Sequence, residues 1–311
     1  MTKLGLALGS GGVRGFAHLG VIEVLEQEGI PIDAIAGSSA GAAVGAMYAF
    51  RPKLAPCLTQ VRHYLNSELY DNTKLGYLRQ TEETRQNFYD KMKVRLAQGA
   101  VFATSVTKNA LFTEEVLRTN VEYLIPPVNI EESLIPLSVV TFDLSTGREI
   151  ILREGPLVPA IMASCAIPGV FPPVAHGDYM LMDGGIIDPV PVAHTRDLRA
   201  DLVVGVDVAP LPDALKPLGT SYEVAMRAAD ISRFKLKTLL LREADLVINV
   251  PLNDVFWADF SQLEHCVEAG REAAREALPR IREALGHPVE ALPSPATSAA
   301  PRPTETDDAS A

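Results

Sequence analysis

The beginning of the chain alternates twice between a short apolar run and a longer helical run, and glycines lie at the junctions. The runs at 3–8 and 32–36 have the length and apolar content of buried strands, whereas those at 16–27 and 40–50 predict helices. An alternation of strand and helix is typical of a parallel sheet covered on both faces. We therefore expect an α/β protein.

The rest of the chain divides into regions of different character. Further strands are predicted at 137–142, 149–152, 179–182, 202–208 and 246–250, with a turn at 145–147 that predicts a hairpin between the first two. An amphipathic helix is predicted at 260–285. Residues 51–130 are charged, carry helical patterns at 81–96 and 112–124, and predict a helical insertion. We expect one domain, 1–288, that contains this insertion, and a tail at 289–311 too poor in large apolar residues to fold.

Composition excludes some partners. The net charge is −11, whereas nucleic-acid binding requires a dense basic face, so we expect no nucleic acid. An acidic chain is also repelled by anionic membranes, so any lipid contact should be local and apolar or use small basic clusters. Lys91, Lys93 and Arg95 form one such cluster, although a solvated helix face explains them better.

The cysteines and the N-terminus indicate a compartment. Three separated cysteines without metal-binding or redox spacing fit a reducing cytoplasm, and the first apolar run is too short for a signal peptide. Residues 34–50 carry no charge and could imitate a membrane span. They fall short of the roughly 20 residues that a span needs, so a fully buried core helix is the better interpretation.

The sequence GSSAG places Ser39 between a predicted strand and a predicted helix. This is the context of a nucleophile elbow, in which the serine occupies a sharp, strained turn and small neighbours such as Gly37 and Gly41 avoid a clash. The N-terminus of the following helix favours developing negative charge. A second interpretation is that these small residues only allow close helix packing.

The sequence GSGGVRG at 9–15 admits three interpretations: a phosphate-binding loop, a packing turn or an oxyanion hole. A dinucleotide-binding fingerprint needs glycine where Arg14 stands, and no GK[ST] motif of a nucleoside-triphosphate loop is present. As an oxyanion hole, Gly11 and Gly12 would let backbone N–H groups approach a carbonyl. Arg14 would then fix the loop, or else form an ordinary salt bridge.

A serine nucleophile needs a proton acceptor, and two kinds are available. Asp183 with His194 or His265 would complete a conventional triad, but neither histidine has a convincing setting, and His18 is interpreted as structural. In YMLMDGG, a strand delivers Asp183 to its end and two glycines clear space after it. In a pocket poor in water, this carboxylate could act directly as the base, although a plain turn aspartate has the same pattern.

The order of four motifs decides between these alternatives. GSGGVRG, GSSAG, MASCAIPGVFPPV at 162–174 and DGGIIDPVP at 183–191 together resemble the patatin-like phospholipase family, especially its compact bacterial members. The resemblance covers residues 4 to about 208. It differs at Asp188, where the family often has asparagine.

The resemblance implies a three-layer α/β/α sandwich and a Ser–Asp dyad without a catalytic histidine. By position, Ser39 is the nucleophile, Asp183 the base, and the loop Gly11, Gly12, Val13 and Arg14 the oxyanion hole. No metal or cofactor is implied. We expect a cytoplasmic hydrolase of lipid acyl esters, such as phospholipids or lysophospholipids, that can touch a membrane peripherally. The alternatives are a regulatory protein that binds acyl chains or a protein partner, and a nucleotide-binding protein.

Overall fold

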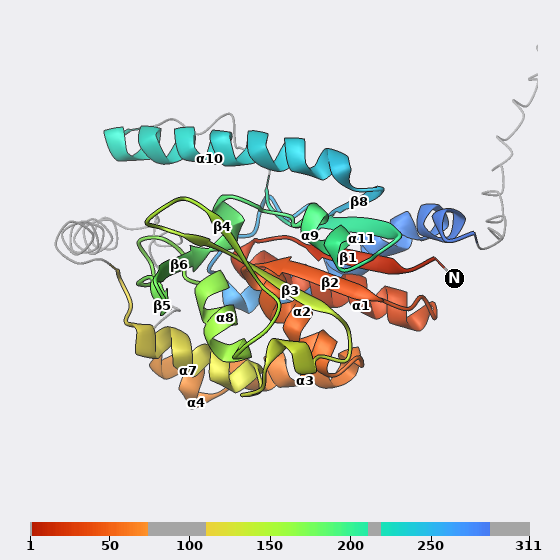
Figure 1. Ribbon diagram of the computed structural model, residues 1–311, viewed down its shortest axis with the longest axis horizontal. Helices are drawn as coiled ribbons and strands as arrows, with labels where there is room; N and C mark the ends of the chain where they lie inside the picture. The colour runs from red at the N-terminus through yellow and green to blue at the C-terminus, as the bar shows by residue number, and fades with distance from the viewer. Residues whose placement is uncertain (1, 74–109, 211–218, 287–311) are drawn as a thin grey trace, which may run out of the picture.

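The protein is described by a computed structural model that covers residues 2–73, 110–210 and 219–286. A central sheet carries helices on both faces, so the prediction of a three-layer α/β/α fold is confirmed (Figure 1). The predicted helix at 81–96, the basic residues Lys91, Lys93 and Arg95, and the predicted tail at 289–311 lie outside the described residues.

The sheet is mainly parallel at its centre and antiparallel at one end. Its strands are β1 (Leu4–Leu8), β2 (Ala34–Ser38), β3 (Leu137–Asp143), β4 (Glu149–Leu152), β5 (Val174–His176), β6 (Tyr179–Asp183), β7 (Leu202–Asp207) and β8 (Leu246–Asn249). The pairing path is β5-β6-β3-β2-β1-β7-β8, and β4 forms the predicted hairpin with β3. Every residue of β1 is buried, because helices cover both faces of a parallel sheet.

The register at β3 brings two other strands end to end. Ser38, the last residue of β2, pairs with Val140, and Asp183, the last residue of β6, pairs with the next residue, Thr141. β4 occupies the opposite edge of β3 along the same stretch, so β2 and β6 share one edge. The ends of β2 and β6 therefore meet, and the residues that follow or end them become neighbours.

Helices form two unequal layers. They are α1 (Ala17–Gln27), α2 (Ala40–Phe50), α3 (Leu54–Leu65), α4 (Glu68–Asn72), α7 (Glu114–Leu124), α8 (Leu157–Ser164), α9 (Val192–Asp197), α10 (Ser221–Leu240) and α11 (Leu263–Ala284), with short 3-10 helices η1 (Gly12–Phe16), η2 (Ile130–Glu132), η3 (Gly184–Ile186), η4 (Leu241–Glu243) and η5 (Phe260–Gln262). The larger core packs most of them against one face. A smaller core, which includes Ala7, Ala34, Val192 and Val203, packs α9 against the other (Figure 1).

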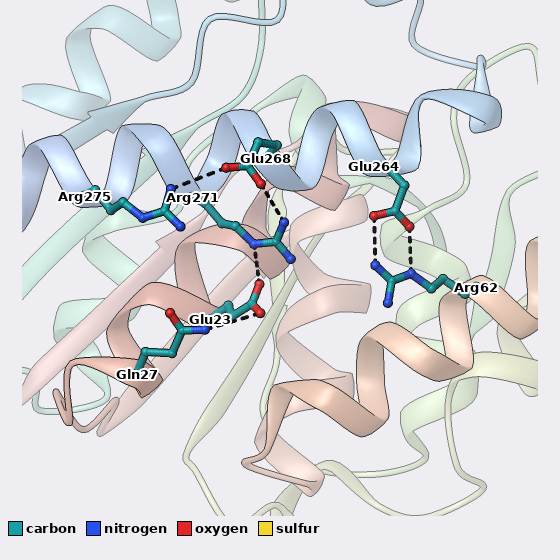
Figure 2. Close-up of polar contacts among 7 residues, drawn as sticks. All are labelled: Glu23, Gln27, Arg62, Glu264, Glu268, Arg271 and Arg275. Atoms are coloured by element: carbon teal, nitrogen blue, oxygen red, sulfur yellow. Dashed lines mark hydrogen bonds and ion pairs between the residues drawn. The ribbon is translucent and has the colours of Figure 1, made fainter.

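The contact between α1 and α11 is unusually close. A Cβ at Gly20 would lie 2.0 Å from the Val267 carbonyl oxygen, and one at Gly270 would lie 2.0 Å from that of Ala17. Ion pairs border this contact: Arg271 of α11 reaches Glu23 of α1 at 2.6 Å (Figure 2). Glycine is required at both positions because the two backbones touch.

Arg62 of α3 also reaches α11. Its guanidinium donates two hydrogen bonds to Glu264, with Nε 2.7 Å and Nη2 2.8 Å from the carboxylate oxygens (Figure 2). Both side chains are largely exposed, so the pair contributes at most about 1 kcal/mol to stability. It joins α3 to α11 at the surface.

Helix α10 lies apart from the sheet (Figure 1). Val224, Met226, Ile231 and Leu239 are large apolar side chains that it leaves exposed. A buried ion pair attaches it, since Lys237 Nζ lies 2.6 Å from the carboxylate of Asp207 at the end of β7. No helix was predicted here from the sequence.

Within the described ranges, no helix is both long and apolar enough to cross a membrane. Helix α2, which contains most of the uncharged stretch, is a buried core helix of 11 residues, as predicted. The cytoplasmic location and the peripheral membrane contact stay predictions.

Candidate active site

Ser39 lies in a strained turn between β2 and α2. Its backbone has φ 55° and ψ −123°, which is rare for a residue with a side chain. A Cβ at Gly37 would come within 2.5 Å of Ala42, and one at Gly41 would lie 2.1 Å from the Leu8 carbonyl oxygen. Small residues on both sides therefore permit the turn, and they leave Ser39 at the N-terminus of α2.

Asp183 lies directly beside this serine. The Ser39 hydroxyl donates a hydrogen bond of 2.7 Å to Asp183 Oδ2, and the Gly185 N–H donates one of 2.8 Å to Oδ1. Burial raises the pKa of Asp183 to about 6, although these two hydrogen bonds oppose the shift. The carboxylate is thus ionised near neutral pH and is a stronger proton acceptor than an exposed aspartate.

Ser164, at the end of α8, supports the turn from the other side. The Ser39 N–H donates to Ser164 Oγ at 2.9 Å, and the Ser164 hydroxyl donates to the Val140 carbonyl at 2.7 Å. Reasoning from the sequence gave Ser164 no role. The available signal was its place in the motif at 162–174, although the motif alone does not reveal a contact with the elbow.

The glycine loop forms a 3-10 turn next to the elbow. Gly12 has φ +59°, and a Cβ on it would lie 2.4 Å from the Trp257 carbonyl oxygen. The Val13 N–H donates to this same carbonyl at 2.8 Å, so this donor is occupied. Among the predicted oxyanion-hole residues, Gly12 reaches the cavity described below. Trp257, which joins this loop from far along the chain, was not predicted.

Arg14 is buried beside the loop. Its Nε and Nη1 atoms are buried and find no hydrogen-bond partner among the described residues, and burial lowers its pKa. Its side chain does not line the cavity. The structure therefore shows neither of the two roles considered for Arg14, a brace for the loop carbonyls or a salt bridge.

An apolar cavity of about 180 Å³ opens at Ser39. Its walls come from α2, α3, α7, α8 and the segment after α8, and include Met47, Val61, Leu117, Val121, Ile161 and Phe171. Two polar groups on the wall, the Tyr64 hydroxyl and the Asn120 side chain, hydrogen-bond to each other. The described parts of the predicted insertion thus form one side of a pocket that suits a hydrocarbon chain.

The histidines have other settings. His18 is buried with Nε2 2.7 Å from the Gly9 carbonyl oxygen, and burial lowers its pKa to about 4. His194 contacts Glu149, His265 lies near Asp254, and His176 is exposed. Across the described ranges, no histidine hydrogen-bonds to Ser39 or Asp183. The geometry therefore contains a serine and a carboxylate but not a conventional triad.

One cluster has the composition of a metal site. Glu149, Asp188 and His194 bring one ligand atom each to within 4.8 Å of one another. The cluster lies behind the elbow, because the Ser38 hydroxyl donates to the Asp188 carbonyl at 2.6 Å. It does not contact Ser39 or Asp183 directly.

Comparisons with known proteins give the following matches. A family model described as patatin-like phospholipase matches residues 6–195. An uncharacterized NTE family protein of Mycobacterium tuberculosis is 37% identical over 206 residues, which are 66% of this chain and 49% of that protein. This chain thus spans about half the length of that mycobacterial relative.

Two further matches are more distant. A lysophospholipase of Aspergillus fumigatus is 30% identical over 211 residues, 68% of this chain and 12% of that protein. The crystal structure of VipD from Legionella pneumophila aligns with a TM-score of 0.49 and 17% identity, over 89% of this chain and 66% of VipD.

Proposed function

The chain belongs to the patatin-like phospholipase family, and we propose on this basis that it hydrolyses acyl esters of lipids through Ser39 and Asp183. The observation that carries the proposal is the 2.7 Å hydrogen bond from the Ser39 hydroxyl to Asp183, beside an apolar cavity. Phospholipids or lysophospholipids are the proposed substrate class, and fungal relatives named lysophospholipase support this choice.

In the first half of the reaction, Ser39 Oγ attacks the ester carbonyl carbon while Asp183 Oδ2 accepts the hydroxyl proton. The carbonyl oxygen becomes an oxyanion. The carbonyl double bond then re-forms, the bond between the carbonyl carbon and the alcohol oxygen breaks, the alcohol takes the proton from Asp183, and an acyl-serine remains. In the second half, Asp183 takes a proton from water, the hydroxide attacks the acyl carbon, and Ser39 leaves with its proton restored. The products are a fatty acid and an alcohol.

The oxyanion is the species that the glycine loop is proposed to stabilise. The N–H groups of Gly11 and Gly12 are the proposed donors, together with the positive N-terminal end of α2. The Val13 N–H joins them only if the loop moves away from Trp257, because the Trp257 carbonyl accepts its hydrogen bond. Arg14 is included in the proposed oxyanion hole because its backbone belongs to the same loop.

The acyl chain is assigned to the cavity. A cavity whose polar wall groups already hydrogen-bond to each other offers hydrocarbon contact without leaving a polar group unsatisfied. Burial of a fatty-acyl chain there contributes about 0.8 kcal/mol for each methylene group removed from water. We therefore propose that chain length affects KM more strongly than head group does.

Labelling with a fluorophosphonate probe tests the nucleophile and the base. The wild-type chain should be labelled at Ser39, with the site read by mass spectrometry, whereas Ser39→Ala and Asp183→Asn should not react. His18, His194 and His265 variants should keep most of the labelling, since no proton passes through an imidazole in this mechanism. A folded histidine variant that loses labelling completely would replace the dyad with a triad.

The rival function, a regulatory protein that binds acyl chains or a partner, makes a different prediction for the same experiment. Wild-type protein would then bind fatty acid, yet it would neither react with the probe nor hydrolyse p-nitrophenyl esters or phospholipids. The hydrogen-bonded pair of Ser39 and Asp183 argues against this alternative, because binding alone requires no strained serine at φ 55°.

A further inference from the structure

Three side chains from separate elements converge behind the elbow. Glu149 begins β4, Asp188 follows η3, and His194 lies in α9. His194 Nε2 is 2.9 Å from Glu149 Oε2 and 3.7 Å from Asp188 Oδ2. All three ligand atoms lie within 4.8 Å of one another. Glu149 is far in sequence from Asp188 and His194, so it is the fold that brings the two carboxylates and the imidazole together.

Two buried atoms of this group have no hydrogen-bond partner among the described residues. Asp188 is only 5% exposed, and its Oδ1 atom has no hydrogen-bond partner in the described part of the chain. The buried Nδ1 atom of His194 is also without a hydrogen bond there. A buried carboxylate oxygen without a donor is costly in free energy, and native proteins rarely contain one without a reason.

The charges of the group also call for a cation. Asp188 is buried, and the Glu149 carboxylate lies in the same cluster, so two carboxylates share one small region. His194 is the basic group that touches Asp188, at 3.7 Å, and it also faces Glu149 and Asp197. Arg153 already pairs with Asp197, so Glu149 and Asp188 remain, and one imidazolium cannot neutralise both carboxylates. A divalent ion would balance them.

We propose that Glu149, Asp188 and His194 bind a divalent transition-metal ion such as Zn²⁺. Each would supply one ligand: a carboxylate oxygen from Glu149 and Asp188, and Nε2 from His194. Zinc accepts oxygen and imidazole ligands at about 2.0–2.2 Å, and water completes its coordination. The imidazole favours a transition metal over Mg²⁺ or Ca²⁺, which prefer oxygen ligands.

The surroundings resemble the second layer of contacts that metal-binding histidines have. A ligating histidine usually donates its other ring N–H to a carboxylate. Asp197 Oδ2 lies 3.6 Å from His194 Nδ1, and Arg153 holds Asp197 through a 2.8 Å hydrogen bond. On metal binding, Nε2 of His194 gives up its proton to bind the ion, and Nδ1 keeps the proton that faces Asp197. Glu149, with its side chain 35% exposed, provides the entry path.

The position of the ion suggests what it does. The backbone of Asp188 accepts the Ser38 hydroxyl at 2.6 Å, and the segment that ends at Asp188 begins with Asp183. An ion on the Asp188 side chain would tie this segment to β4 and α9. The proposed hydrolysis needs no metal, and no step passes through the ion, so its effect is on stability and on the position of the elbow.

Titration of the tag-free, full-length chain with Zn²⁺ after chelator treatment tests the proposal. Calorimetry should show about one equivalent bound, Tm should rise, and Co²⁺ in place of Zn²⁺ should give a visible absorption band. His194→Ala and Glu149→Gln should each weaken Zn²⁺ binding by about 10-fold or more. His265→Ala is the matched control, because that histidine is half-exposed beside another aspartate and should leave affinity unchanged.

Other results would overturn the proposal. The proposal is wrong if the folded wild-type chain does not bind Zn²⁺. It is also wrong if neither His194→Ala nor Glu149→Gln reduces the affinity for Zn²⁺. The latter would assign the ion to thiols or to surface groups. Glu149→Gln keeps the test valid if His194→Ala fails to fold, since Glu149 lies at the accessible edge of the sheet. Fluorophosphonate labelling of Ser39 is measured separately, so the test of the metal site and the test of the proposed hydrolase activity give independent results.

Discussion

Acidification should inactivate the proposed hydrolase over a pH range that Asp183 sets. Burial raises the pKa of Asp183 to about 6, and only the carboxylate form can accept the Ser39 proton. With this pKa, about 97% of Asp183 is ionised at pH 7.5 but only about 9% at pH 5. We therefore expect kcat/KM to fall about tenfold between these pH values. An unshifted aspartate would stay more than about 90% ionised at pH 5 and would predict almost no change.

The assay is kcat/KM for an uncharged short-chain p-nitrophenyl ester from pH 4.5 to 8, read where p-nitrophenol absorbance does not depend on pH. Circular dichroism at each pH checks the fold. A carboxyl group whose pKa is raised in the folded state binds protons more tightly there than in the unfolded chain. Protonation of Asp183 therefore stabilises the folded state relative to the unfolded chain as pH falls. Loss of activity through this group is thus not caused by unfolding.

Asp188 is the other buried carboxyl near the elbow, and burial raises its pKa to about 7. Repeating the profile with Asp188→Asn separates the two groups, because the decline near pH 6 should persist. If kcat/KM stayed constant down to pH 5 in folded wild-type protein, the pKa of Asp183 would not be raised, and the reasoning from its burial would be wrong. A decline that vanished in Asp188→Asn would assign the titration to Asp188 instead.

Three further substitutions test the site and the packing around it. Gly12→Val should reduce ester turnover by about 100-fold, because its side chain would meet the Trp257 carbonyl oxygen 2.4 Å away. Gly147→Val is the control, because Gly147 lies in an exposed turn with φ +72° and nothing within 4 Å, and this variant should keep full ester turnover. Ser164→Ala should lower the free energy of unfolding by about 1–3 kcal/mol in urea titration, since the buried Ser39 N–H loses its acceptor. Gly270→Ala should lower it by about 1–3 kcal/mol or more, as a Cβ 2.0 Å from a backbone oxygen of α1 pushes the helices apart; an unchanged Tm would contradict the close contact.

The parts of the fold that the sequence predicted are those set by local patterns. Strand β1 and helix α2 were predicted because short, fully buried elements are continuous apolar runs bordered by glycine. Strand β2 begins at Ala34 and ends at Ser38, two residues later at each end than predicted, because pairing with β1 and β3 determines its length. Helix α10 was missed, since most of its described side chains are exposed and these form no apolar face toward the core.

Local sequence patterns likewise predicted some residues of the candidate site but not others. Ser39 and Asp183 each carry a local signature, a small-residue turn after a strand and a DGG sequence. The contacts of Ser164 and Trp257 with the elbow and the glycine loop join residues far apart in sequence, so no local pattern reveals them. Glu149 is likewise far in sequence from Asp188 and His194, and its approach to them depends on the hairpin of β3 and β4 and on the packing of α9.

The central position of β1 has a consequence for how the protein forms during synthesis. One neighbour, β2, follows within the next 30 residues, but the other, β7, begins at Leu202. At about 5–20 residues per second, a ribosome needs about 10–40 s to reach it. Throughout this interval one edge of a fully apolar strand is unpaired, and the glycine loop still lacks the Trp257 carbonyl that holds Val13. Pairing between such distant segments makes folding slow and leaves the nascent chain open to aggregation, so the N-terminal loop is among the last parts of the molecule to be completed.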